Sequence, residues 1–155
     1  MELKTKVNAE DGRQDLRITR EFDLPVELIF KAHTDAELLA QWMGTKVLKL
    51  ESKKHGSYQL ETSDNNGNVV FKANGTIHGL IPDKKIIRTF EMDGAQFGVQ
   101  LEVYEFESLT DGTSKLTIHS IYETPAQRDQ LLKMPFTQGL NYAHNRMQEI
   151  LTKLK

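Results

Sequence analysis

Cysteine is absent from this chain of 155 residues. Its absence excludes disulfides, thiolate nucleophiles and zinc or iron–sulfur centres held by cysteine. Long apolar runs are missing too, since no window approaches the roughly 18 to 20 residues of a membrane-spanning helix. The N-terminal sequence MELKTKVNAEDG also lacks the apolar core of a signal peptide. These absences predict a cytoplasmic protein that has no membrane partner.

No charge of one sign predominates. Twenty basic residues stand against 22 acidic residues, which leaves a net charge of −2. Binding of nucleic acid depends on basic patches, so we expect no nucleic-acid partner. The chain is long enough to bury a core. We expect a single domain over residues 1–155, as a monomer or a homodimer.

Motifs for metals, cofactors and common nucleophiles are also missing. The sequence contains no P-loop, no G-x-G-x-x-G fingerprint and no G-x-S-x-G nucleophile elbow. A metal site needs two or three converging ligands, and the histidines lack the H-x-H or H-x-x-x-H spacing. His78 and His119 each follow an isoleucine in an alternating pattern, so we expect them to face away from the core. We therefore expect no metal and no cofactor, and we assign no catalytic residue.

The N-terminal part of the chain alternates and then changes period. Residues 3–9 and 15–22 alternate around an Asp-Gly turn signal, which predicts a hairpin. Helical spacing follows, because four residues recur at i, i+3, i+4 and i+7 on one face of a first short helix. These residues are Val26, Ile29, Phe30 and His33.

A second short helix carries the only tryptophan of the chain, Trp42. Thr34 and Glu37 have the spacing of a capping box, which predicts Thr34 as its N-cap. Gly44 is a suitable C-terminal stop. The expected apolar face comprises Leu38, Leu39, Trp42 and Met43.

Strand periodicity continues from there to about residue 123. Six segments alternate between turn clusters, and such short links predict antiparallel neighbours in meander order. The segments are 47–52, 56–63, 68–81, 84–92, 96–109 and 113–122.

The closing segment predicts a helix from 136 to 153, with a shorter helical piece before it. A sheet with one apolar face needs a cover, and the last helix is the only long amphipathic element available. The predicted fold is α+β of the helix-grip type. A curved antiparallel sheet surrounds a long C-terminal helix, and two short helices follow the first long strand. A strongly bent meander around one helix leaves a cavity between the two.

Several stretches together resemble a known family. The segment ITREFDLPVELIFKAHTDAELLAQWMG is similar to the opening of the activator of heat-shock protein 90 ATPase homologue 1-like family. The stretch KKHGSYQL resembles its Gly-Gly-x-Tyr motif, and FKANGTIHGLIPDKKIIRTFE resembles its central block. The segment DQLLKMPFTQGLNYAHNRMQEILTKL is similar to its closing helix, so the resemblance covers residues 17–154. Departures from the pattern are His55 in place of a second glycine, Pro135, and Met147 in place of leucine.

The resemblance implies the START-like fold of the SRPBCC superfamily, that of the birch pollen allergen, with a cavity for apolar small molecules. The namesake co-chaperones are longer, and this chain is similar only to their second domain. Relatives with this fold include cyclases and hydrolases that act on polyketide-like substrates. The resemblance thus implies a binding module for an apolar or aromatic molecule. The alternatives are a co-chaperone-like protein of the stress response and an enzyme that uses the same cavity.

We predict that ligand-binding residues come from the strands, the short helices and the last helix. Apolar pockets with a few polar side chains are the usual ligand sites, so both kinds of residue are candidates. The apolar and aromatic candidates are Phe30, Trp42, Phe71, Phe90, Phe97, Met134, Leu140 and Met147. The candidates with a polar group are His33, Tyr58, Ser120, Tyr122, Asn141 and His144.

Two further expectations concern single features. Glu102, Glu105 and Glu107 are acidic residues on one strand, and a solvated edge is a better interpretation than an acid/base pair. Trp42 is expected to close one end of the cavity against Phe30 and the last helix, with its indole N–H bonded at the rim. The alternative is that Trp42 only fixes the short helices to the sheet.

Overall fold

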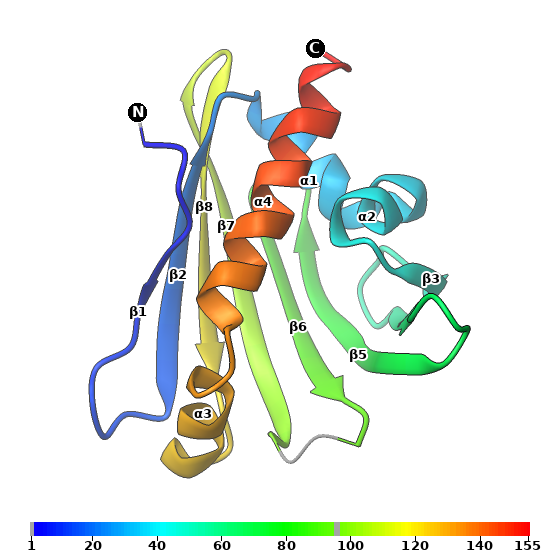
Figure 1. Cartoon of the computed structure of the whole chain (residues 1–155). Coiled ribbons are helices and arrows are strands. Elements are labelled where there is room, and N and C mark those ends of the chain that lie inside the picture. The colour runs from blue at the N-terminus through cyan, green and yellow to red at the C-terminus, as the bar shows by residue number, and fades with distance from the viewer. Residues whose placement is uncertain (1, 95–96) are drawn as a thin grey trace.

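Eight strands form one antiparallel sheet in the order β1-β2-β8-β7-β6-β5-β4-β3 (Figure 1). The computed structural model describes residues 2–94 and 97–155. The strands from β3 to β8 are neighbours in chain order because short turns join them, which confirms the predicted meander. The strands are β1 Lys6–Asn8, β2 Asp15–Phe22, β3 Lys46–Leu50, β4 Ser57–Ser63, β5 Val69–Ile81, β6 Lys85–Met92, β7 Val99–Thr110 and β8 Thr113–Ile121.

The N-terminal hairpin joins the meander through β2 and β8, which are far apart in the sequence. Asp15 lies opposite Ile121 and Phe22 lies opposite Ser114, so the two strands pair along their whole length. The predicted turn before β7, and the start of that strand at residue 96, fall partly on residues outside the described ranges.

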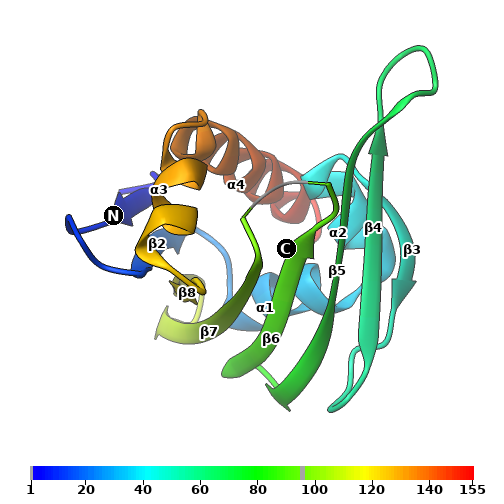
Figure 2. The ribbon, with the colours of Figure 1, turned by 90° about the horizontal axis from the view of Figure 1, so that it is seen from below.

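Four helices accompany the sheet: α1 Val26–Thr34, α2 Ala36–Met43, α3 Pro125–Leu132 and α4 Phe136–Thr152. Helix α4 lies on the concave face of the sheet, where it buries His144, Met147 and Leu151 (Figure 2). The pair α1–α2 lies at one end of the curved sheet, and α3 lies near the other end. This arrangement confirms the predicted α+β helix-grip fold. No helix in the described ranges is long and apolar enough to cross a membrane.

The junction of the two short helices differs from the prediction by one residue. Asp35, and not Thr34, is the N-cap of α2, and its carboxylate accepts a hydrogen bond from the backbone N–H of Leu38. The Thr34 hydroxyl instead donates to the carbonyl of Phe30, at the end of α1. With only one residue between α1 and α2, the last residue of α1 is not free to act as a cap.

The turn before β4 has a backbone geometry that suits glycine. His55 has a positive φ of 67°, a conformation that favours glycine. At the next position, a Cβ on Gly56 would lie 2.1 Å from the carbonyl oxygen of Glu51, so no side chain fits. The unusual His55 therefore occupies a position where a glycine would be less strained.

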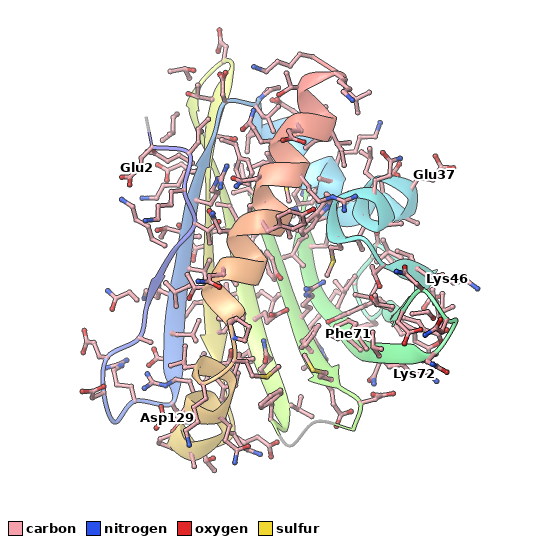
Figure 3. All side chains as sticks on the ribbon, in the orientation of Figure 1. Glu2, Glu37, Lys46, Phe71, Lys72 and Asp129 are labelled. Atoms are coloured by element: carbon pink, nitrogen blue, oxygen red, sulfur yellow. The ribbon has the colours of Figure 1, made fainter. Side chains whose placement is uncertain are left out.

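Alternation along β5 separates the two faces of the sheet. Phe71 points to the concave side, while its neighbour Lys72 points outward, as do the labelled charged residues Glu37, Lys46 and Asp129 (Figure 3). The Phe71 side chain therefore lies on the side of the sheet that faces α4.

Candidate functional site

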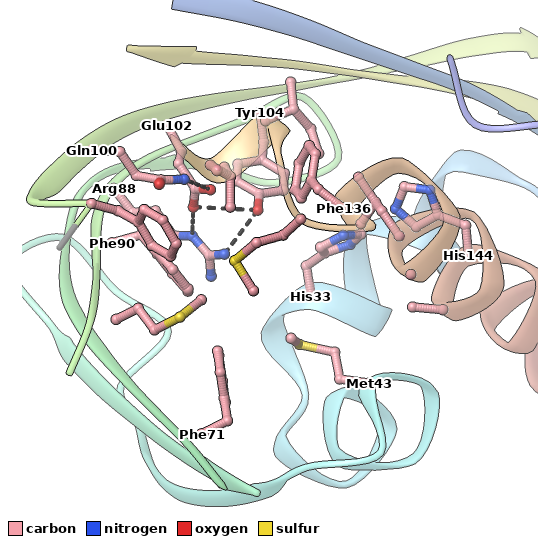
Figure 4. A pocket seen from close by; sticks show the side chains of 18 of the residues that line it. His33, Met43, Phe71, Arg88, Phe90, Gln100, Glu102, Tyr104, Phe136 and His144 are labelled. Carbon is pink, nitrogen blue, oxygen red and sulfur yellow. Dashed lines mark hydrogen bonds and ion pairs between the residues drawn. The ribbon is translucent and has the colours of Figure 1, made fainter. Parts of the chain in front are cut away.

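A cavity of about 380 Å³ lies between the concave face of the sheet, helix α2 and the N-terminal half of α4 (Figure 4). Its wall is mostly apolar and rich in aromatic and methionine side chains. The exposed residues Met134 and Pro135 line it from the α3–α4 turn, so the cavity opens on this side. A volume of about 380 Å³ and a mostly apolar wall fall within the range typical of small-molecule sites.

The structure brings eight of the predicted ligand-binding residues to this wall. They come from α1, α2, β5, β6, the segment before β7, the α3–α4 turn and α4. These residues are His33, Trp42, Phe71, Phe90, Phe97, Met134, Leu140 and His144.

Six predicted residues do not line the cavity: Phe30, Tyr58, Ser120, Tyr122, Asn141 and Met147. Phe30 packs in the core with its ring 5.1 Å from that of Phe106, and Met147 is fully buried. Ser120 and Tyr122 are likewise buried in the body of the fold.

Tyr58 and Asn141 make structural contacts instead. The Tyr58 hydroxyl donates to the carbonyl of Thr89 at 2.5 Å, next to Gly75, where a Cβ would collide with it. The side-chain oxygen of Asn141 accepts from the backbone N–H of Thr5. Tyr58 is buried in the core, whereas Asn141 is half-buried beside the N-terminal segment. Residue type alone could not separate these positions from the cavity wall.

A buried ion pair at one end of the cavity was missed by the sequence prediction. Arg88 and Glu102 lie opposite each other on β6 and β7, and Arg88 Nε is 2.8 Å from Glu102 Oε1. Arg88 Nη2 also donates to the Tyr104 hydroxyl at 2.8 Å, and Gln100 Nε2 donates to Glu102 Oε2 at 2.9 Å. All four residues line the cavity (Figure 4). The signal that could have revealed the pair is the alignment of the two strands, which places opposite charges face to face.

Glu102 therefore does not belong to a solvated edge, which corrects that expectation, whereas Glu105 and Glu107 are exposed as predicted. Only 14% of the Arg88 side chain and 9% of the Glu102 side chain are accessible. Burial by itself lowers the pKa of Arg88, but the surroundings, chiefly Tyr104, Tyr58 and Glu102, raise it above its usual value. Arg88 is thus a cation, and its charge is balanced by Glu102.

His33 projects from α1 to the cavity and is 7% exposed. Its Nδ1 lies 2.7 Å from the carbonyl oxygen of Ile29, and because a carbonyl only accepts, Nδ1 carries the proton. Burial lowers the pKa of His33 to about 4, while the bond to Ile29 raises it and Arg88 lowers it further. The ring is therefore neutral at pH 7, with the lone pair on Nε2. Within the described chain, this Nε2 is buried and has no hydrogen-bond partner.

Trp42 packs between the two histidines of the cavity wall. Its ring centre lies 5.2 Å from that of His33 and 6.1 Å from that of His144. Its indole N–H donates to the carbonyl of Ala32 at 2.8 Å, deep in the structure. Trp42 lines the cavity near α4. The prediction that its indole N–H bonds at the rim is wrong, because the N–H instead donates to the buried Ala32 carbonyl near the end of α1.

His144 is the second buried histidine of the wall. Its Nδ1 lies 2.7 Å from the Thr5 hydroxyl oxygen, and only 1% of the residue is exposed. Burial lowers the pKa of His144 to about 3, with smaller contributions from His33 and Arg20. The cavity therefore holds two neutral imidazoles and one balanced ion pair, and the net charge of its wall is zero. In residues 2–94 and 97–155, no group of three or more potential ligands lies close enough to hold a metal ion.

Solved structures of similar shape come from several bacteria. A protein from Rhodobacter sphaeroides is 19% identical and superposes with a TM-score of 0.84, covering 96% of this chain and 99% of that one. Protein Ms6760 from Mycobacterium smegmatis is 20% identical, with a TM-score of 0.83 and coverage of 95% and 96%. Protein NE0264 from Nitrosomonas europaea is 23% identical, with a TM-score of 0.79 and coverage of 96% and 100%. At these identities the likeness establishes the fold.

No curated protein matches the chain significantly. A family model does match, over residues 23–152, and it is described as activator of Hsp90 ATPase homolog 1-like protein. The matched region includes α1 and α2, the strands from β3 to β8, and the helices α3 and α4. The chain therefore belongs to the activator of Hsp90 ATPase homolog 1-like protein family.

Proposed function

We propose that the protein is a small-molecule binding module that holds an apolar or aromatic ligand between the sheet and α4. The observation that carries this proposal is the cavity of about 380 Å³, whose wall is apolar except for one hydrogen-bonded cluster and two histidines. An empty apolar cavity of this size would forfeit packing contacts, so a ligand that fills it is stabilised by burial and dispersion. The fold and the family membership also support a role in binding small molecules in general.

The proposal is tested by incubating the protein with small-molecule extracts of a cell lysate, followed by native mass spectrometry. Recovery of an unchanged apolar or aromatic compound in a one-to-one complex is the expected result. Recovery of a converted product would instead support the alternative of a cyclase- or hydrolase-like enzyme acting in the cavity.

Two neighbouring residues on α4 provide a matched pair of variants. Ala143 lines the cavity, whereas Tyr142 is 65% exposed. Ala143→Phe adds a ring to the cavity and should abolish ligand retention, while Tyr142→Phe should leave it unchanged. Equal retention by both variants would contradict binding in this cavity.

The family description favours a second candidate, a protein that interacts with a chaperone. This role would use the outer surface and is independent of the cavity. It is tested with a purified Hsp90 chaperone, whose ATPase rate should rise when this protein is added. An unchanged rate would rule out the activity that the family description names.

A further inference from the structure

One nitrogen of the Arg88 guanidinium differs from the other two in its contacts. Nε donates to Glu102 and Nη2 donates to the Tyr104 hydroxyl, but Nη1 makes no hydrogen bond within residues 2–94 and 97–155. The partnerless polar side-chain atoms that this part of the chain encloses completely are His33 Nε2 and the Tyr122 hydroxyl oxygen. Arg88 Nη1 is not one of them, so it retains accessible surface.

This accessible surface belongs to the cavity. Arg88 lines the cavity, and 14% of its side chain is accessible. Figure 4 shows the side chain projecting from β6 toward the space between the sheet and the short helices. Its Cζ lies 4.8 Å from the ring centres of both Tyr58 and Tyr104, and these contacts hold the guanidinium in place. Nη1 is therefore a positioned donor at the cavity wall.

A bound ligand has to supply what Nη1 lacks. A guanidinium nitrogen only donates, so its partner in the ligand must be an acceptor. Water can fill this role before a ligand binds, but a wholly apolar ligand would displace that water without replacing its hydrogen bond. A charged donor left without an acceptor weakens binding roughly ten- to a hundredfold. The ligand that suits this wall best therefore carries an acceptor next to Arg88.

Charge decides which kind of acceptor fits. The Arg88 cation is already balanced by Glu102, whose Oε1 lies 2.8 Å from Nε. A ligand carboxylate at Nη1 would bring a second negative charge to this buried pair, and the described wall holds no further cation to balance it. A carbonyl oxygen accepts without carrying a charge. Unlike a hydroxyl group, it also brings no hydrogen that needs an acceptor of its own.

The rest of the wall describes the body of the ligand. Aromatic rings line the cavity from β5, β6, β7 and α4, and they favour a flat aromatic skeleton. We infer that the cavity binds an uncharged aromatic ligand whose carbonyl oxygen accepts a hydrogen bond from Arg88 Nη1. This inference rests on the proposed binding function and names the ligand class.

Three probes of nearly equal shape separate the possibilities: 2-acetylnaphthalene, 2-isopropenylnaphthalene and 2-naphthoate. Isothermal titration calorimetry should show the tightest binding for the ketone, 2-acetylnaphthalene. The isopropenyl compound has a CH₂ group in place of the carbonyl oxygen and should bind about tenfold more weakly. The carboxylate should bind roughly a hundredfold more weakly than the ketone, because its charge is buried without a free partner.

One variant tests the role of charge. Glu102→Gln removes the carboxylate that balances Arg88 and leaves the guanidinium in place. In this variant 2-naphthoate should become the tightest of the three probes, because its charge now replaces the one that was removed. If the ketone remained the tightest probe in Glu102→Gln, charge balance would not select the ligand.

A double variant tests the donor. Arg88→Met combined with Glu102→Gln removes the donor without leaving a buried charge, and it should weaken 2-acetylnaphthalene about tenfold, to the level of the isopropenyl compound. Binding of 2-isopropenylnaphthalene should not weaken. The matched control is Arg17→Met combined with Glu107→Gln, which makes the same two changes at exposed positions away from the cavity. This control should bind all three probes as the wild type does.

Infrared spectroscopy needs no variant and remains decisive should the double variant fail to fold. The carbonyl stretch of 2-acetylnaphthalene bound to the wild-type protein should lie below its frequency in hexane, because a hydrogen bond weakens the C=O bond. Equal affinities for the ketone and the isopropenyl compound, with a carbonyl stretch as in hexane, would overturn the inference and leave the binding function intact. Tightest binding of 2-naphthoate to the wild type would overturn the uncharged ligand class. Binding of none of the three probes would count against the proposed function itself.

Discussion

Trp42 donates a hydrogen bond to a carbonyl group at the end of the preceding helix, α1. Its indole N–H donates to the carbonyl of Ala32 at 2.8 Å, and Ala32 is among the last residues of α1, where carbonyls have no partner within the helix. The second short helix is therefore fixed to the first by a buried hydrogen bond. The same ring lies against His33 and His144, so one residue fixes the helix pair and forms part of the cavity wall.

Replacement of Trp42 tests this relationship. Trp42→Phe keeps an aromatic ring but leaves the Ala32 carbonyl unsatisfied, so we expect a loss of about 1–3 kcal/mol in the free energy of unfolding. Trp42→Ala also leaves a void and should cost about 3–5 kcal/mol. Urea denaturation measures both, with Tyr142→Phe on the surface of α4 as a control. A Trp42→Phe protein as stable as the wild type would show that the hydrogen bond contributes nothing.

The buried ion pair predicts that Arg88 and Glu102 are strongly coupled in their effect on the free energy of unfolding. Arg88→Met leaves a carboxylate buried without its cation, and we expect destabilisation of about 3–5 kcal/mol. Arg88→Met combined with Glu102→Gln should recover most of this loss, because the amide is neutral and can still accept from Gln100. A double-mutant cycle from denaturation curves measures the coupling. If the two changes were simply additive, the pair would not be coupled.

The buried histidines predict a loss of stability in mild acid. The pKa values of about 4 for His33 and about 3 for His144 lie below the value of 6.5 for an unfolded chain. Below pH 6.5 the unfolded state therefore binds more protons than the folded state. The folded protein keeps its full stability above pH 6.5 and loses stability as pH falls toward 4. With two such groups, the slope of unfolding free energy should approach about 2.7 kcal/mol per pH unit.

Denaturation midpoints recorded from pH 7 to pH 4.5 measure this slope. His33→Gln removes one of the two histidines that take up a proton on unfolding, so the slope should fall to about half of the wild-type value. His78→Gln replaces an exposed histidine and should retain the wild-type slope. A slope that is the same in wild type and His33→Gln would refute the assignment.

The strained turn before β4 predicts a stabilising substitution. His55 has a φ of 67°, where a side chain costs about 1 kcal/mol or more relative to glycine. His55→Gly should therefore raise the melting temperature by a few degrees, about 1 kcal/mol in unfolding free energy. The neighbouring Gly56→Ala should have the opposite effect, since its Cβ would collide with the Glu51 carbonyl. Differential scanning calorimetry of both variants decides the point, and a lower melting temperature for His55→Gly would exclude backbone strain.

Periodicity predicted much of the fold because local physics controls it. Strand alternation, turn residues and the stripe on the last helix defined the meander, the helix-grip arrangement and the inward side of each element. The same local pattern missed the cap at Asp35, because Thr34 and Asp35 are both good caps and only the tight connection between α1 and α2 selects one.

The candidate site was only partly predictable. Inward-facing residues such as Phe71 and Phe90 were identified, but Met147 and Phe30 face inward as well and are packed in the core. Whether an apolar residue meets another side chain or an open space depends on the curvature of the sheet, which no short stretch of sequence encodes.

The sequence by itself determined the order of the elements, the apolar character of the concave face and the family. Only the tertiary structure decided that β2 closes against β8 and that Glu102 lies buried beside Arg88. It also decided that His33 Nε2 has no hydrogen-bond partner among residues 2–94 and 97–155. The reason is physical. Secondary structure follows from contacts between residues close in the chain, whereas the charge balance and unsatisfied atoms of a cavity follow from contacts between residues that are distant in the sequence and meet only when the sheet has curved around the helix.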